Sequence, residues 1–378
     1  SPYEARISDL FEEVVGRPIG PEQRFFDAGA SSLDLMRFHL RCTAEPDLRF
    51  TIPDLFEHVT VRRLAAFLES AAPAPEAAGA SSASADEPIA VIGMAVRLPG
   101  ADDLAAFWDL VRTGARGIEH FDATDGRVGA RSQMSGLLSF DPEHFGVSRQ
   151  EARLMDPQQR HLLMSSVQAL AHAGITDPGA GRVGLVAGCG ENTYFQALLR
   201  EADPDHVPDG FQMALHHDKD FLTTKVAYHL DLSGPAFSVQ AACASSLVAV
   251  HVAAGLLRQG DADVMLAGGV LVDTLLTDGY TYRPQHIFSK DGHCRPFSDD
   301  ASGTIGASGV GVVVLKPLRS ARRDGDTVYA VITGSALNND GSGKLSYSAP
   351  SLAGQREVIR SALRRSGRDG SDVSYVEA

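Results

Sequence analysis

The spacing of apolar residues divides the chain into two segments with different secondary structure. Residues 1–70 show helical periodicity, because apolar positions recur every three or four residues and no strand-type alternation competes with them. The positions that carry this pattern are Leu10, Phe11, Val14, Val15, Leu33, Met36, Leu40, Val61, Leu64 and Leu68. It predicts an all-α domain of four short helices around one small core, a size that suits a carrier or docking module better than an enzyme.

The second segment alternates short apolar runs with amphipathic helices, which is typical of an α/β fold with a buried sheet. Strands are predicted at 89–92, 184–187, 237–242, 264–267, 311–315 and 328–332. An amphipathic helix is predicted between the first two strands, on the apolar positions Leu104, Phe107, Trp108 and Val111. Its expected N-cap is Asp102 or Asp103, and Gly114 is its expected stop.

A stretch without large apolar residues separates the two segments. Residues 71–87 read AAPAPEAAGASSASADE, a composition that cannot bury a core and is typical of a flexible tether. We therefore predict a multidomain chain: a carrier-sized domain at 1–70, a flexible linker at 71–87, and an α/β domain at 88–378.

Charge and overall composition exclude several functional classes. The formal net charge of −14 argues against nucleic-acid binding, which requires a clustered basic surface. No stretch approaches the roughly 20 uninterrupted apolar residues of a membrane-spanning helix. The chain opens on Ser1 without the pattern of a signal peptide, and the missing initiator Met suggests a segment of a longer polypeptide. We expect a cytoplasmic protein that binds neither nucleic acid nor membrane.

Cysteine and histidine spacing gives no metal site. The chain has four cysteines, Cys42, Cys189, Cys243 and Cys294. They are far apart and form no CxxC pair, so neither a zinc site nor a disulfide framework is expected. For all of them except Cys243, a small buried hydrophobe is the favoured interpretation. We expect surface or structural roles for four histidines, His216, His217, His286 and His293.

Two adjacent serines stand at the start of a predicted helix, where a serine is first of all a good N-cap. The stretch FFDAGASSLDLM at 25–36 resembles the modification loop of acyl and peptidyl carrier proteins, and TIPDLFEHVTVRRLAAFL at 51–68 resembles their later helices. The resemblance implies that Ser32 carries covalent 4′-phosphopantetheine, at a helix N-terminus whose dipole favours the phosphodiester. Family members commonly have Asp before that serine. Ser31 stands there in this chain, and of the two serines we favour Ser32.

Cys243 lies where the apolar run 237–242 ends and a very apolar helix, predicted at 244–257, begins. At such a turn the helix N-terminus stabilises a thiolate, and nearby backbone N–H groups can form an oxyanion hole. The helix is so apolar that we expect it to be internal.

The residues around Cys243, VQAACASSLVAVHVAAGLLRQGDADVMLAGGV, resemble the active-site segment of ketosynthases of the thiolase superfamily. Similar segments over 87–378 are PIAVIGMAVRLPGADDLAAFWDLV, MDPQQRHLL, LTTKVAYHLDLSGPA, DGHCRPF, GVGVVVLKPL and ALNNDG. The resemblance implies a thiolase-like fold with αβαβα layers, a homodimer, and Cys243 as the nucleophile. Ala242 and Ala244 replace the Thr and Ser that the family commonly has beside this cysteine, and we expect altered pocket shape or hydrogen bonding there.

Together the two resemblances imply a segment of a modular polyketide synthase. The carrier domain would tether acyl intermediates as phosphopantetheine thioesters. The synthase, an acyltransferase, would take the acyl chain onto Cys243 for decarboxylative condensation with a malonyl-type extender. The expected partners are carrier-bound thioesters, neighbouring synthase modules and an acyltransferase.

The family's catalytic histidines follow a strand that resembles residues 374–378. The resemblance therefore places them beyond Ala378, and we expect the synthase domain to be incomplete at its C-terminus. Two other functions stay open: a ketosynthase that only passes the acyl chain onward, and a didomain whose role is carrier–synthase docking.

Overall fold

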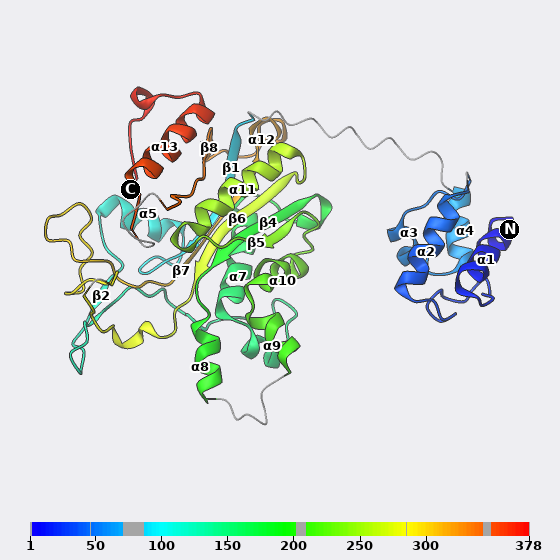
Figure 1. Cartoon of the computed structure of the whole chain (residues 1–378), viewed down its shortest axis with the longest axis horizontal. Coiled ribbons are helices and arrows are strands. Elements are labelled where there is room, and N and C mark those ends of the chain that lie inside the picture. The colour runs from blue at the N-terminus through cyan, green and yellow to red at the C-terminus, as the bar shows by residue number, and fades with distance from the viewer. Residues whose placement is uncertain are drawn as a thin grey trace. The chain divides into compact units, whose positions relative to one another are not determined.

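The computed structural model describes residues 2–45, 47–70, 87–201, 209–284, 286–342 and 349–377. Two compact units are present (Figure 1), one within residues 1–80 and the other within 81–378. Each has its own hydrophobic core. Apart from Glu87, the predicted linker at 71–87 lies outside the described residues.

The small unit is helical, as predicted. Its described residues form α1 (Pro2–Val15), α2 (Ser32–Thr43), α3 (Ile52–Glu57) and α4 (Val61–Ser70). Three aromatic rings, Phe11, Phe25 and Phe38, meet at the centre of the core, and each pair has its centroids 5.6 Å apart. Tilted and edge-on packing at this distance stabilises the pairs beyond the burial of their area.

The orientation of α2 differs from the one predicted. Met36 and Leu40 were expected in the core, but their side chains are 44% and 69% exposed. The buried face of α2 instead consists of Leu35, Phe38 and Cys42. Both faces of this helix carry apolar residues, and the face with Phe38 is buried because its ring completes the aromatic cluster and removes a large apolar area from water.

The large unit is built on a six-stranded mixed sheet with the strand order β5-β4-β6-β7-β1-β8. The strands are β1 (Ile89–Arg97), β4 (Val183–Cys189), β5 (Ala236–Ser238), β6 (Val264–Leu271), β7 (Gly309–Pro317) and β8 (Ala330–Ile332). β4 runs parallel to β5 and to β6, and the other neighbours are antiparallel. All six predicted strands are present, although the strand expected at 237–242 ends at Ser238, because the chain turns there toward Cys243.

Helices cover both faces of this sheet (Figure 1). α7 (Pro157–His172) and α10 (Leu222–His229) pack on one face, and α11 (Ser245–Gln259) packs on the other. Along β4, Leu185 belongs to the first core and Val186 to the second, as the alternation of a strand requires. The described residues of this unit therefore form three successive layers, α, β and α.

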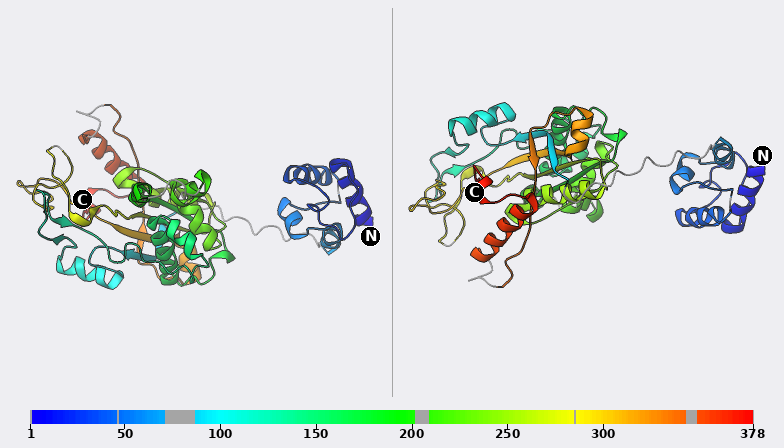
Figure 2. Two further views of the ribbon diagram at one scale, coloured as in Figure 1. Left: turned by 90° about the horizontal axis from the view of Figure 1, so that it is seen from below. Right: turned by 90° about the horizontal axis from the view of Figure 1, so that it is seen from above.

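Further elements surround these layers. They are a small hairpin, β2 (Glu119–His120) with β3 (Ala130–Arg131), and the helices α5 (Leu104–Thr113), α6 (Arg149–Leu154), α8 (Thr193–Glu201), α9 (Gly210–His217), α12 (Leu318–Asp324) and α13 (Leu352–Ser366). Both views of Figure 2 place α5 and α13 on opposite sides of the sheet. α5 has the predicted ends, with Asp103 as N-cap and Gly114 as left-handed C-cap.

α11 was expected to be internal, and this expectation is wrong for one of its faces. Ala249, Ala253 and Leu257 are buried against β4 and β6, whereas Leu247 is 73% exposed. A helix that lies on a sheet buries the stripe that faces it. Among the described residues, Ala242–Gln259 is also the one helical stretch long and apolar enough to cross a membrane, judged by length and composition only. Its packing on the sheet identifies it as a core helix.

The aromatic cluster gives a direct test of the orientation of α2. We expect Phe38→Ala to lower the free energy of unfolding of the small unit by about 3–5 kcal/mol, since a fully buried ring is lost. Leu40→Ala on the exposed face is the matched control, and it should change stability by less than about 0.5 kcal/mol. Urea denaturation followed by hydrogen exchange of residues 2–70 measures both values. A larger effect at Leu40 would show that the sequence-based orientation was right.

Candidate functional site

The structure places Cys243 between the end of a strand and the start of a helix, as predicted. β5 ends at Ser238, a 3₁₀ turn forms at Ala242–Ala244, and α11 begins at Ser245. The Cys243 side chain is exposed at this turn. The thiol is therefore accessible to a reactant in solution.

The turn contains backbone strain immediately before the cysteine. Ala242 has a φ of 49°, in the left-handed region that residues with a Cβ rarely adopt. Such a residue costs on the order of 1–3 kcal/mol and persists only where its surroundings hold it. Two hydrogen bonds do so: the Ala241 N–H donates to Ser245 Oγ at 2.9 Å, and Ser245 Oγ–H donates to the Ala242 carbonyl at 2.7 Å.

Two glycines bring the first turn of α11 against the sheet. A Cβ on Gly188, in β4, would lie 2.5 Å from Ser245 Cβ and 2.7 Å from the Val239 carbonyl oxygen. A Cβ on Gly269, in β6, would lie 2.9 Å from Ser246 Cβ. Real Cβ atoms do not approach so closely, so glycine is required for this contact. Gly188 and Gly269 lie just beyond the strands predicted at 184–187 and 264–267, and glycine beside a strand is a signal of close backbone approach that was not recognised from the sequence.

Backbone N–H groups at this turn are suited to stabilise an oxyanion. The first hydrogen bond within the turn runs from the Ala244 N–H to the Ala241 carbonyl, at 3.1 Å. The N–H of Cys243 precedes that bond, in the part of a helical turn whose donors have no partner within the helix. An exposed thiol beside such a donor is an arrangement for acyl transfer.

Burial distinguishes two of the other cysteines from Cys243. Burial raises the pKa of Cys42 to about 12 and that of Cys189 to about 11. Both therefore remain neutral thiols at physiological pH, which are poor nucleophiles. Cys189 also accepts a hydrogen bond from Gln240 Nε2 at 3.5 Å. Cys42 is buried as expected, whereas Cys189 and Cys294 are only partly buried.

A buried polar network supports the loop that follows β4. Gln158, at the N-terminus of α7, donates from Nε2 to the Asp156 carboxylate and accepts from the Gly190 N–H at 2.9 Å. Burial raises the pKa of Asp156 to about 6. The segment MDPQQRHLL thus joins α7 to the loop beside Gly188. The sequence did not predict the role of this segment, because the contact is between residues far apart in the chain.

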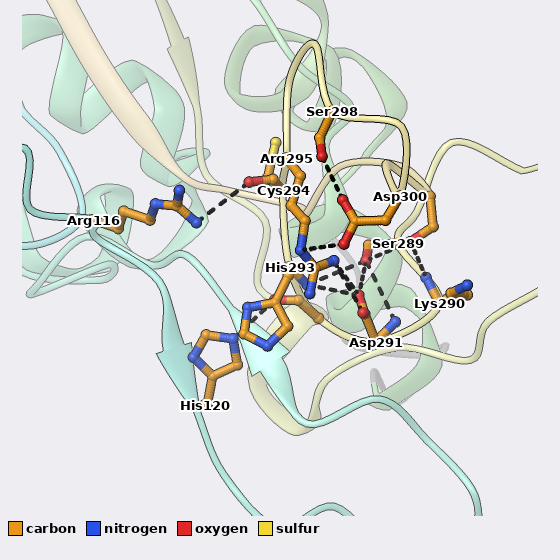
Figure 3. Close-up of polar contacts among 12 residues, drawn as sticks. Arg116, His120, Ser289, Lys290, Asp291, His293, Cys294, Arg295, Ser298 and Asp300 are labelled. Atoms are coloured by element: carbon orange, nitrogen blue, oxygen red, sulfur yellow. Dashed lines mark hydrogen bonds and ion pairs between the residues drawn. The ribbon is translucent and has the colours of Figure 1, made fainter.

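The segment DGHCRPF forms a separate polar cluster before β7 (Figure 3). Asp291 accepts hydrogen bonds from Ser289 Oγ at 2.8 Å and from Arg295 Nη1 at 3.0 Å, and these contacts lower its pKa to about 2. The His120 and His293 rings lie with their centroids 4.7 Å apart. The part of the chain that the structure describes contains no group of three metal-ligating side chains. The contacts of this cluster fix the conformation of a loop.

The other histidines singled out from the sequence occupy different environments. His216 and His217, at the end of α9, are 4% and 6% exposed, so they are buried structural residues. Burial lowers the pKa of His217 to about 4, and its ring stacks on Phe195. His286 is exposed.

In the small unit, the capping serine is Ser31. Its Oγ accepts the Asp34 N–H at 3.2 Å and donates to the Asp34 carboxylate at 2.6 Å, while that carboxylate accepts the Ser31 N–H. This is a capping box, and the hydrogen bonds from Ser31 lower the pKa of Asp34. Ser32 is then the first residue of α2, so of the two adjacent serines it is Ser31 that has the capping role expected of a serine at this helix start.

The start of α2 fits a phosphate group. The helix is long enough to present a positive N-terminal end, which favours an anion. The loop before it contains Gly29 at a φ of 91°. A Cβ on Gly29 would lie 2.8 Å from Arg17 Nη1, so a guanidinium group lies directly beside this loop.

Comparison with protein families identifies the large unit. Residues 86–321 match the family model described as the N-terminal domain of β-ketoacyl synthase, and residues 329–378 match the model of its C-terminal domain. The chain belongs to the β-ketoacyl synthase family. Residues 5–68 match the model described as the phosphopantetheine attachment site. The order predicted from the sequence, a carrier domain followed by a ketosynthase, is thereby confirmed, as is 4′-phosphopantetheine as a covalent cofactor.

Similar proteins are polyketide synthases. The chain is 42% identical over 312 residues to a phenolphthiocerol/phthiocerol polyketide synthase protein of Mycobacterium tuberculosis, a match that covers 76% of this chain and 21% of that protein. It is 35% identical over 404 residues to an erythronolide synthase of Saccharopolyspora erythraea, covering 98% of this chain and 11% of that protein. The chain thus spans about a fifth or less of these two relatives.

Similar solved structures are ketosynthases. Ketosynthase twelve of the bacillaene polyketide synthase of Bacillus amyloliquefaciens matches with a TM-score of 0.73 and 30% identity, over 77% of this chain and 54% of that one. The ketosynthase of module 1 of the bacillaene synthase, from the same species, has a TM-score of 0.70 and 35% identity, over 78% of this chain and 54% of that one. These matches confirm the predicted thiolase-like α/β fold class.

The contact between α11 and the sheet can be tested by adding one methyl group. We expect Gly188→Ala to lower the free energy of unfolding of the synthase unit by about 1–3 kcal/mol, because the new Cβ overlaps Ser245 and backbone. Gly255→Ala, later in α11, is the matched control: its added Cβ meets no atom within 4 Å. It should raise stability by about 0.4–1 kcal/mol. Thermal denaturation measures both, and equal effects would contradict the proposed packing.

Proposed function

We propose that this chain acts in a polyketide synthase, where its ketosynthase domain accepts an acyl group on Cys243 and uses it in a carbon–carbon condensation. The observation that carries the proposal is the exposed Cys243 thiol, at a strained turn next to backbone N–H donors, in a domain of the β-ketoacyl synthase family. The proposed domains are the carrier at 1–70, the linker at 71–87 and the synthase at 88–378.

The chemistry of the first step follows from these groups. The phosphopantetheine arm supplies a thiol that holds the acyl group as a thioester. The Cys243 thiolate attacks the acyl carbonyl carbon, and the N–H groups of the turn donate to the oxygen as it gains negative charge. The bond between the acyl carbon and the carrier sulfur would then break, so that the acyl group remains on Cys243 Sγ and the released thiolate is protonated by solvent. A malonyl-type extender would then lose CO₂, and its carbanion equivalent would attack this acyl group. The bond between the acyl carbon and Cys243 Sγ would break, which releases the Cys243 thiolate and leaves a β-ketoacyl thioester.

We assign the phosphopantetheine to Ser32 rather than Ser31. The Ser31 hydroxyl is engaged with Asp34 in the capping box, and its modification would remove the hydrogen bonds that begin α2. Ser32 occupies the first helical position, where the helix dipole favours a phosphodiester. The histidines at 216, 217, 286 and 293 have no part in this proposal.

Two surfaces support the proposed partners. Met36 and Leu40 are exposed on the helix that begins at Ser32, so a partner enzyme that reaches Ser32 meets an apolar face. We propose that the partners are carrier-bound thioesters, neighbouring modules and an acyltransferase.

β5 is an edge strand, and Phe237 on it is 40% exposed. A second copy that packs there would form the proposed homodimer. We place the protein in the cytoplasm.

A transfer-only ketosynthase is the alternative. The two functions share the transfer of an acyl group to Cys243 and differ only in the condensation that follows it.

Mass spectrometry tests the proposed sites. The chain is treated with a phosphopantetheinyl transferase and coenzyme A, and then with an acyl-thioester donor. We expect a phosphopantetheine adduct on Ser32 and an acyl adduct on Cys243. Ser32→Ala should lose the first adduct and Cys243→Ala the second, whereas Cys294→Ala should retain both. An adduct on Ser31 would overturn the carrier assignment, and a folded protein without acyl-Cys243 would favour a docking role.

A further inference from the structure

The side chain of Ser245 makes two hydrogen bonds to the turn that carries Cys243. Ser245 is the first residue of α11, and its side chain is buried, with 7% of its surface exposed. Its hydroxyl accepts the Ala241 N–H and donates to the Ala242 carbonyl, at 2.9 and 2.7 Å. One side chain thus bonds the two residues that precede the nucleophile.

These two bonds act on the strained residue of the turn. Ala242 needs support because its left-handed φ of 49° is unfavourable for a residue with a Cβ. The Ala242 carbonyl accepts both the Ser245 backbone N–H and its hydroxyl. Rotation of the peptide between Ala242 and Cys243 would break these bonds. The same peptide contains the Cys243 N–H, so the bonds also fix the direction of that donor.

The sheet holds Ser245 itself in place. Gly188 leaves room for Ser245 Cβ, since a Cβ on that glycine would lie 2.5 Å away. The side chain of Ser245 is therefore confined between β4 and the turn, and its hydroxyl oxygen lies within hydrogen-bond distance of both partners. Its neighbour Ser246 is exposed and makes none of these bonds to the turn.

We propose that Ser245 is a positioning residue for acyl transfer: its hydroxyl holds the Ala242–Cys243 peptide so that the Cys243 N–H points to the developing oxyanion. Ser245 does not touch the acyl group. This inference rests on the proposed function, because it assumes that Cys243 is the acylated residue.

Two reactions of Cys243 distinguish a misplaced Cys243 N–H from a general disturbance of the structure around the thiol. Acylation by a small acetyl thioester, acetyl-N-acetylcysteamine, develops an oxyanion, whereas alkylation by iodoacetamide needs only an accessible thiolate. We expect Ser245→Ala in the full chain to slow acylation by about 10- to 100-fold, as for other misplaced catalytic groups. The alkylation rate and its pH profile should stay close to those of the wild type. Ser245→Thr keeps the hydroxyl and should restore acylation.

Ser246→Ala is the matched control on the same helical turn, and it should acylate at the wild-type rate. If Ser245→Ala does not fold, the double variant Ser245→Ala/Ala242→Gly relieves the left-handed strain; it should fold and still acylate slowly. An unchanged acylation rate in Ser245→Ala, or in the double variant, overturns the inference. Equal losses in acylation and alkylation also overturn it. A wild-type protein that is alkylated but never acylated would instead refute the proposed function, and the inference with it.

Discussion

The close contact between the first turn of α11 and the sheet is the constraint on which the site depends. It exists because Gly188 and Gly269 have no side chains where Ser245 and Ser246 approach. The contact brings the helix that follows Cys243 onto the central strands, which are buried on both faces. A nucleophile at this position lies on rigid elements, and rigid support keeps a thiol and its N–H donors in a fixed relation.

In the turn before α11, the free-energy cost of backbone strain is opposed by the free energy of two hydrogen bonds. A left-handed alanine costs about 1–3 kcal/mol. The two hydrogen bonds of the Ser245 hydroxyl contribute about 1 kcal/mol each. The strain at Ala242 is therefore offset locally, and the turn needs no large distortion elsewhere. This accounts for a buried serine at the start of a largely apolar helix.

In the small unit, the residues that stabilise the fold differ from those proposed to bind the cofactor and partners. The Phe11, Phe25 and Phe38 cluster fixes the orientation of α2, and the Ser31–Asp34 capping box fixes where that helix begins. Together they leave Ser32 at the first helical position. They also turn Met36 and Leu40 to the surface, so the structural core and the proposed partner surface use opposite faces of one helix.

The sequence by itself determined the helical and α/β character of the two segments, since periodicity depends on local backbone geometry. It also predicted Cys243 at a strand-to-helix turn, and the motifs around Ser32 and Cys243 indicated the two families. Only the tertiary structure decided which face of α2 is buried, that one face of α11 is exposed, and that Ser31 is the cap. It alone brought Gly188 to Ser245 and Gln158 to Gly190, because such contacts join residues distant in the chain, and their energies depend on packing that no local pattern contains.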